Sequence, residues 1–171
     1  MSLYSPMSEP GYVLVVCTGN ICRSPMGAAL LQHALSAQRE PLRSLRVVSA
    51  GVASRSGEPA SPNAVTALKK VGLDLKSHLS RPVTQELLDH AVLVLCMTEA
   101  HREMIERVAA PAPPRVKLFK EFMGGKGDME IPDPYGLHLT AYESSRDEMV
   151  TAIPSIVAYL QKLPAAAFAG R

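Results

Sequence analysis

YVLVVCTGNICRSP, residues 12–25, joins an apolar run to a short polar loop and the start of a helix. The β-branched residues within 12–16 predict a buried strand, and Ser24 followed by Pro25 predicts an N-cap and a first helical position. The loop therefore connects the C-terminal end of a strand to the N-terminus of a helix. Unpaired backbone N–H groups and the helix dipole favour an anion at such a junction.

The loop also carries the side chains needed to bind a phosphate and to attack it. Arg23 is a planar cation that suits two phosphate oxygens at once. This guanidinium and the helix N-terminus both stabilise a thiolate at Cys17, although a lone cysteine is more often a small buried hydrophobe. Here strand, thiol, glycine, arginine and helix start coincide, so we predict a nucleophile at Cys17. The predicted phosphate-binding residues are Thr18, Gly19, Asn20, Ile21, Cys22 and Ser24. Besides its capping role, Ser24 is expected to donate a hydrogen bond to the Cys17 thiolate.

Length and composition indicate one domain in a reducing compartment. A chain of 171 residues can bury a core without disulfides, and its three cysteines do not form the framework of a secreted protein. Residues 1–11 lack the segments of a signal peptide, and no apolar run is long enough to span a membrane. We therefore expect a cytoplasmic protein without a membrane partner, with a loose leader at 1–11 and a single domain at 12–171.

Charge and histidine spacing exclude two further classes of site. The net charge of +2 is dispersed and forms no basic stripe for nucleic acid. The five histidines show no paired ligand spacing, so no metal site and no cofactor are expected.

Strand and helix patterns alternate along the remaining chain. The predicted strands are 12–16, 45–49, 91–96 and 116–119, and the predicted helices are 25–37, 62–71, 85–89, 99–108 and 140–163. This alternation predicts a three-layer α/β fold, in which helices cover both faces of a four-stranded parallel sheet and the phosphate-binding loop follows the first strand.

Local signals refine the ends of these helices. Thr140, with Glu143 three residues later, predicts a capping box for the last helix, and Pro154 should kink it. Ser61 is the expected cap of the helix at 62–71. Residues 120–135 form a long glycine-containing segment, which we expect to be a functional loop.

At residues 17–25 the chain resembles the low-molecular-weight protein tyrosine phosphatase family, and the resemblance extends over about residues 12–163. Three further stretches support the resemblance: VSAG at 48–51, the Ser-His-x-x-Arg stretch around His78, and IPDPYG at 131–136. The resemblance implies that Asp133 protonates the leaving oxygen and then acts as the base when water hydrolyses a phosphocysteine. It also implies that Ser49 and His78 support Asn20, a residue type that tolerates positive φ.

The side chains around the expected pocket favour an aromatic substrate. Ile21 supplies an apolar wall and Tyr135 an aromatic one, which suit a phenyl ring. We therefore predict a protein tyrosine phosphatase that acts on phosphorylated proteins and releases inorganic phosphate. The body of the chain is closer to the bacterial branch that includes phosphoarginine phosphatases, which typically carry Thr at the position of Ile21 and often Phe at that of Tyr135. A protein-arginine phosphatase is the alternative.

Two other functions are less favoured. Thioredoxin-coupled arsenate reductases share the cysteine loop and a thiol near Cys96, but they need a further thiol after it, and this chain has none. A module that binds phosphate without turnover would not need Cys17, Arg23 and Asp133 together.

The remaining cysteines have different expected roles. Cys22 lies five residues from Cys17 on one tight loop, so we expect a reversible disulfide between them that protects the nucleophile from overoxidation. Cys96 lies within an apolar strand and is expected to pack in the core.

Overall fold

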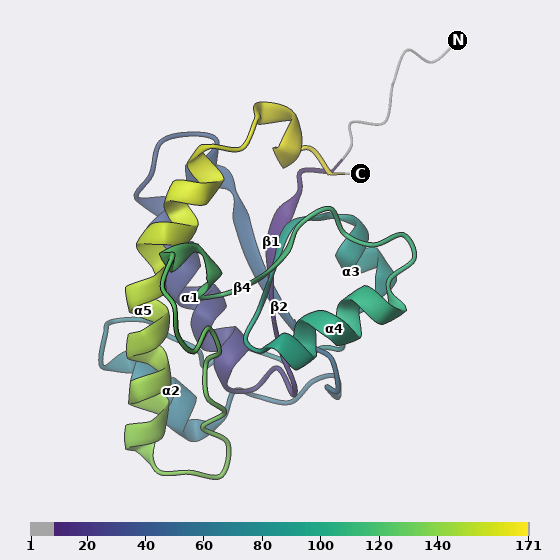
Figure 1. Cartoon of the computed structure of the whole chain (residues 1–171). Coiled ribbons are helices and arrows are strands. Elements are labelled where there is room, and N and C mark those ends of the chain that lie inside the picture. Colours follow the sequence, from purple (N-terminus) through teal and green to yellow (C-terminus); the bar gives the residue numbers. More distant parts are fainter. Residues whose placement is uncertain (1–8, 171) are drawn as a thin grey trace.

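Four parallel strands form the centre of the fold in a computed structural model that describes residues 9–170 (Figure 1). Their order across the sheet is β2-β1-β3-β4. The strands are β1 (Tyr12–Cys17), β2 (Arg46–Gly51), β3 (Ala91–Cys96) and β4 (Val116–Leu118). The predicted four-stranded parallel sheet is therefore confirmed.

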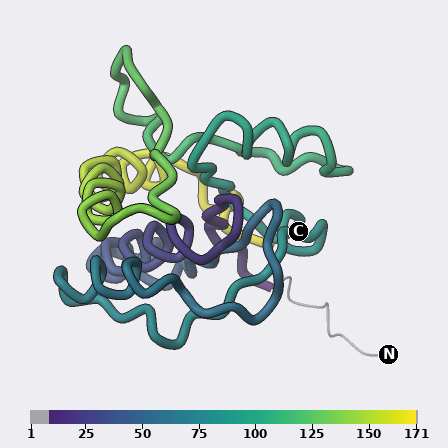
Figure 2. The backbone as a smooth tube through the Cα atoms, turned by 90° about the horizontal axis from the view of Figure 1, so that it is seen from below, coloured from purple at the N-terminus to yellow at the C-terminus, as the bar shows by residue number. Residues whose placement is uncertain are grey.

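Helices cover both faces of this sheet. The helices of residues 9–170 are α1 (Arg23–Ser36), α2 (Pro62–Lys69), α3 (Gln85–Asp89), α4 (Glu99–Val108) and α5 (Leu139–Gln161). Short 3-10 turns lie at Leu42–Ser44, Glu121–Met123 and Ala165–Phe168. Figures 1 and 2 show α1 beside α5 on one side of the sheet and α4 on the other. The three predicted layers are present.

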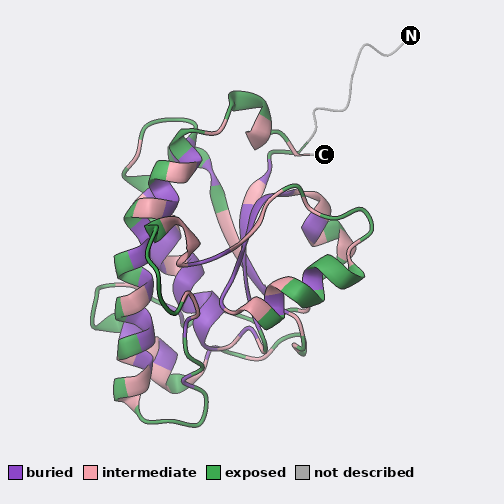
Figure 3. Cartoon of the chain, viewed as in Figure 1, coloured by how far each residue is buried: buried purple, intermediate pink, exposed green. Residues whose placement is uncertain are grey.

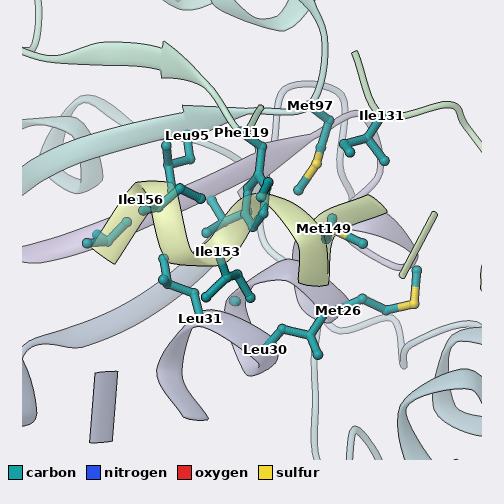
Figure 4. Packing of buried hydrophobic residues seen from close by; sticks show 14 of the residues in the cluster. Met26, Leu30, Leu31, Leu95, Met97, Phe119, Ile131, Met149, Ile153 and Ile156 are labelled. Atoms are coloured by element: carbon teal, nitrogen blue, oxygen red, sulfur yellow. The ribbon is translucent and has the colours of Figure 1, made fainter. Parts of the chain in front are cut away.

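The alternation of side chains along β1 builds both halves of the core. Val13 and Val15 pack with the apolar residues of α1, α2 and α5, whereas Leu14 and Val16 pack with those of α3 and α4. Figure 3 shows the buried strands between helices whose outer faces are exposed. Burial on both faces explains why these strands are almost continuously apolar. Figure 4 shows the larger half of the core, where Met97, Phe119 and Met149 meet.

The order of the strands determines where a ligand can bind. From β1 the chain continues to β2 on one side, and β3 lies on the other side of β1. In open α/β sheets, a crevice forms at the carboxyl ends of the strands where the order reverses in this way. The loop between Cys17 and Arg23 lies at the carboxyl end of β1, so the fold places it in that crevice.

Several helix ends differ from the sequence prediction because side chains bind other partners. Helix α1 begins at Arg23 with Cys22 at the N-cap, so the prediction of Ser24 as the cap is wrong. Helix α5 begins at Leu139 with His138 at its N-cap and no side-chain cap. The predicted capping box at Thr140 is therefore wrong, since Glu143 instead forms an ion pair with Lys70 at 2.9 Å. Pro154 lies inside α5, which continues through it.

The two ends of the described chain lie together. Residues 1–8 of the expected leader lie outside the described residues. Pro10 and Gly11, which we also placed in the leader, pair with the C-terminal segment: Pro10 forms an antiparallel bridge with Ala169, and the Gly11 N–H donates to the Phe168 carbonyl at 3.1 Å. Between residues 9 and 170, no helix has the length and hydropathy needed to cross a bilayer.

Candidate active site

The loop from Cys17 to Arg23 is organised around the buried side chain of Asn20. Its φ of 58° lies in the left-handed region that the sequence predicts for it. Its Nδ2 donates to Ser24 Oγ at 2.8 Å and to Ser49 Oγ at 2.9 Å. Ser24 Oγ in turn lies 2.9 Å from Cys17 Sγ. Because Ser24 accepts from Asn20, its one hydroxyl proton is left for the Cys17 sulfur or for the more distant Ala50 carbonyl at 3.4 Å, and the shorter contact is the one to sulfur.

A second group of contacts holds Asn20 from outside the loop. His78 Nε2 lies 2.6 Å from the Asn20 carbonyl oxygen, and burial lowers the pKa of His78, so its neutral ring donates to that oxygen. The backbone N–H of Arg81 donates to Asn20 Oδ1 at 3.0 Å, and Arg81 Nε donates to the Ser49 carbonyl at 3.0 Å. Ser49 and His78 thus contact Asn20, as the resemblance implies. Arg81, the last residue of the Ser-His-x-x-Arg stretch, is an additional support to which the sequence analysis assigned no role.

The end of β2 lies directly against the loop, at a glycine. A Cβ atom on Gly51 would lie 2.5 Å from the Thr18 carbonyl oxygen and 3.0 Å from the Asn20 backbone nitrogen. Real Cβ atoms do not approach backbone so closely, so only glycine permits this contact between β2 and the loop. The contact explains the Gly in VSAG at 48–51.

Arg23 connects the loop to the segment that carries Asp133. Its side chain is only 4% exposed, Nη1 donates to the Ile131 carbonyl at 3.1 Å, and Nη2 lies 3.4 Å from Asp133 Oδ2. Ser145 Oγ in α5 donates to the Pro132 carbonyl at 3.1 Å. These contacts hold the backbone immediately before Asp133, whose own side chain is 52% exposed and therefore reaches towards solvent.

A cavity of about 190 Å³ lies where these segments meet. Its lining brings together most of the predicted site residues: Cys17, Thr18, Gly19, Ile21, Cys22, Arg23, Asp133 and Tyr135. Asn20 and Ser24 do not line it, because both are fully buried behind the loop. The predicted phosphate-binding set therefore divides into residues that face the cavity and residues that hold the loop.

Cys22 faces the cavity from the N-cap position of α1. Its Sγ lies 3.3 Å from Ser61 Oγ and 3.4 Å from the Tyr142 hydroxyl. Burial raises the pKa of the Cys22 thiol, although both hydrogen bonds act in the opposite direction. Burial also raises the pKa of Tyr142 to about 12. Cys22 is therefore a protonated thiol at neutral pH. This state suits a thiol that reacts only with an oxidised Cys17 better than it suits a second nucleophile.

His101, at the start of α4, is a site residue that the sequence analysis missed. Its Nε2 lies 2.8 Å from Thr18 Oγ1, and the residue is 4% exposed. The only signal in the sequence is that His101 stands three residues after Thr98, at the position of a capping box that normally holds Glu or Gln.

Together these groups can bind and cleave a phosphate ester. The cavity combines a thiol that can receive a hydrogen bond, a buried guanidinium and a carboxylate that lies beside this guanidinium. A thiol in this setting can act as a nucleophile, the guanidinium can bind phosphoryl oxygens, and the carboxyl group can exchange a proton with a leaving oxygen or a water.

Comparisons with known proteins agree with this chemistry. Residues 12–165 match the family model of the low molecular weight phosphotyrosine protein phosphatases. A protein-arginine-phosphatase of Geobacillus stearothermophilus is 38% identical over 89% of this chain and 97% of its own length. A probable low molecular weight protein-tyrosine-phosphatase, EpsP, of Ralstonia nicotianae is 35% identical over 88% of this chain and 97% of its own. The solved structure of the arginine phosphatase YwlE from Geobacillus stearothermophilus superposes with a TM-score of 0.78 at 38% identity, covering 89% of this chain and 94% of that one.

Proposed function

The chain belongs to the low molecular weight phosphotyrosine protein phosphatase family and is a protein phosphatase, and we propose that it hydrolyses phosphotyrosine through a phosphocysteine on Cys17. The observation that carries this proposal is one cavity lined by Cys17, Arg23 and Asp133, with Arg23 Nη2 lying 3.4 Å from Asp133 Oδ2. The nucleophile, the phosphate-binding cation and the proton donor thus surround the same small volume.

In the first half of the proposed reaction, the Cys17 thiolate attacks phosphorus and the bond to the leaving oxygen breaks. Ser24 supports the thiolate by donating a hydrogen bond at 2.9 Å. Arg23 and the loop amides hold the phosphoryl oxygens. Asp133 gives its proton to the leaving oxygen, so that the product is a neutral phenol and not a phenolate.

In the second half, water hydrolyses the phosphocysteine. Asp133, now a carboxylate, takes a proton from the water as the water oxygen attacks phosphorus, and the Cys17 thiolate leaves. Inorganic phosphate is the product. A reducing compartment such as the cytoplasm would keep the nucleophile available, and Cys17, Cys22 and Cys96 are all free thiols.

The walls of the cavity support phosphotyrosine as the substrate. Ile21 and Tyr135 both line it, and Tyr135 is 67% exposed, so its ring is free to contact the leaving group. An apolar wall and an aromatic wall suit a flat phenyl ring. Phosphoarginine is the second candidate, because relatives as similar as the Geobacillus stearothermophilus protein are named arginine phosphatases.

The test compares turnover of phosphotyrosine and phosphoarginine peptides by the same preparation. We expect a higher kcat/KM for phosphotyrosine and complete loss of turnover in Cys17→Ser, which keeps the oxyanion cradle but has no ionisable thiol. A preference for phosphoarginine would contradict the substrate assignment alone, whereas near-normal turnover by Cys17→Ser would contradict the mechanism.

A further inference from the structure

His101 is a buried histidine beside the active site that the proposed reaction does not use. Its Nδ1 accepts a hydrogen bond from the Thr98 N–H at 3.2 Å, while Thr98 Oγ1 accepts one from the His101 N–H at 3.3 Å. The pair forms a reciprocal capping box at the start of α4. Glu or Gln usually fills the position of His101 in this motif, and neither carries an aromatic ring into the protein interior.

These contacts determine where the proton of the imidazole lies. Since Nδ1 accepts from a backbone N–H, the proton of the neutral ring must be on Nε2. Burial, and then the nearby Arg23 guanidinium, lower the pKa of His101 to about 4, so the ring is neutral at neutral pH. Nε2 lies 2.8 Å from Thr18 Oγ1, and its N–H therefore donates to the Thr18 hydroxyl.

The Thr18 hydroxyl consequently has its acceptor positions filled. It accepts from His101 Nε2, and Arg23 Nη2 approaches the same oxygen at 3.5 Å. A hydroxyl has two acceptor positions and one proton, so only the proton is left to be used. Among residues 9–170, no protein group accepts that proton, and Thr18 lines the cavity together with Cys17 and Arg23.

We propose that His101 is a positioning residue that makes the Thr18 hydroxyl a hydrogen-bond donor to the phosphoryl group in the cavity. The Nη2 group of Arg23 contacts Thr18 Oγ1 and also lies next to Asp133, so a phosphoryl oxygen held by this nitrogen comes within reach of the Thr18 proton. If His101 instead accepted from Thr18, the hydroxyl proton would point away from the substrate. That this phosphoryl group belongs to a phosphorylated protein substrate rests on the proposed function.

The test uses two replacements that both suit the capping position. His101→Gln can accept from Thr98 with its carbonyl oxygen and still donate to Thr18 with its amide, whereas His101→Glu can only accept from Thr18. The probe is inorganic phosphate, titrated by calorimetry into the two variants in the Cys17→Ser background. We expect the Glu variant to bind phosphate about ten- to a hundredfold more weakly than the Gln variant, the usual loss for a hydrogen bond to a charged group.

Thr18→Val separates the hydroxyl from the charge that His101→Glu adds. In a Thr18→Val background the Gln and Glu variants should differ only by the effect of that charge, so most of the difference between them should disappear. Thr18→Val by itself should weaken phosphate binding to a similar extent, and because Thr18 is an exposed residue this variant should fold.

Two results would overturn the proposal: equal phosphate affinity in the Gln and Glu variants, or an unchanged difference between them in the Thr18→Val background. Either result would show that His101 acts only as part of the capping box of α4. Phosphate binding does not require turnover, so an enzyme that fails to hydrolyse phosphotyrosine would contradict the proposed function and leave the role of His101 standing.

Discussion

The Oγ of Ser24 lies 2.9 Å from the Sγ of Cys17, which joins the first turn of α1 to the carboxyl end of β1 through two buried side chains. The same hydroxyl accepts from Asn20 Nδ2 at 2.8 Å, which leaves its proton for the sulfur or for the more distant Ala50 carbonyl at 3.4 Å. A serine that resembles a helix cap in the sequence thus supports the nucleophile.

Ser24→Ala should slow the alkylation of Cys17 by iodoacetate at neutral pH. The variant loses a hydrogen bond to a thiolate, and such bonds to charged groups are worth about 1.5–3 kcal/mol, so we expect a decrease of about tenfold or more. The measurement is the rate of inactivation under excess reagent. Ser36→Ala, an exposed serine near the other end of α1, is the matched control and should react as wild type does.

Asp133→Asn should lower turnover of phenyl phosphates by about 10²–10⁴, the usual contribution of a placed general acid or base. The decrease in the first step should shrink for leaving groups of low pKa, because they depart without a proton. Pre-steady-state release of substituted phenols measures that step. Asp128→Asn, on the same segment and exposed, serves as the control. An equal loss with good and poor leaving groups would show that Asp133 does not protonate the leaving oxygen.

Mild peroxide should inactivate the enzyme reversibly. Peroxide oxidises the Cys17 sulfur to a sulfenic acid, which the Cys22 thiolate attacks to form a disulfide with loss of hydroxide. Because burial raises the pKa of Cys22, formation of the disulfide should accelerate as the pH rises. Mass spectrometry of the oxidised protein identifies the linked pair.

Cys22→Ser should make the same peroxide treatment irreversible. Cys96→Ser is the control, since Cys96 is fully buried in β3 and burial raises its pKa to about 12. Full recovery of Cys22→Ser after addition of a thiol reagent would count against a protective disulfide.

Ile21→Thr should shift substrate preference towards phosphoarginine. The replacement keeps the branched shape of the side chain but exchanges an apolar contact with a phenyl ring for a hydroxyl that can bind a guanidinium. An apolar contact of this size discriminates by about 1–3 kcal/mol, or roughly ten- to two-hundredfold in relative kcat/KM. Competition between the two phosphopeptides measures the ratio directly. Ile21→Val, which preserves the apolar surface, should leave the preference for phosphotyrosine unchanged.

Acid should destabilise the wild type more than His101→Gln. The pKa of His101 is lowered to about 4 in the folded state from its ordinary 6.5, so the unfolded chain binds more protons between these values. The contribution of His101 to the free energy of unfolding is fully present above about pH 6.5. It decreases by an amount on the order of 3 kcal/mol as the pH falls towards 4. Urea unfolding of both proteins at pH 7 and pH 4.5 checks this. Parallel pH dependence of the two proteins would contradict a neutral buried His101.

The sequence by itself determined the architecture and the reactive loop. Continuous apolar runs such as residues 91–96 can be buried only between two layers of helices, and their alternation with amphipathic segments requires parallel strands. Likewise, a cysteine at a strand end, Asn20 and Arg23 are local neighbours, and the conformation that they require is a property of a few consecutive residues. Such short-range constraints can be read from the chain directly.

Tertiary structure alone decided which polar partners these residues bind. His101 meets Thr18 across 83 residues because β1 and β3 are neighbours in the sheet and their carboxyl ends meet in one crevice. The sequence allows Ser24 to be a helix cap, a donor to Cys17, or both. Only the packed structure shows that Cys22 occupies the N-cap, while the Ser24 hydroxyl contacts the Cys17 thiol and the Asn20 amide. A hydroxyl or imidazole can satisfy its hydrogen bonds in many ways, and only the packed neighbours that exclude water select one of them.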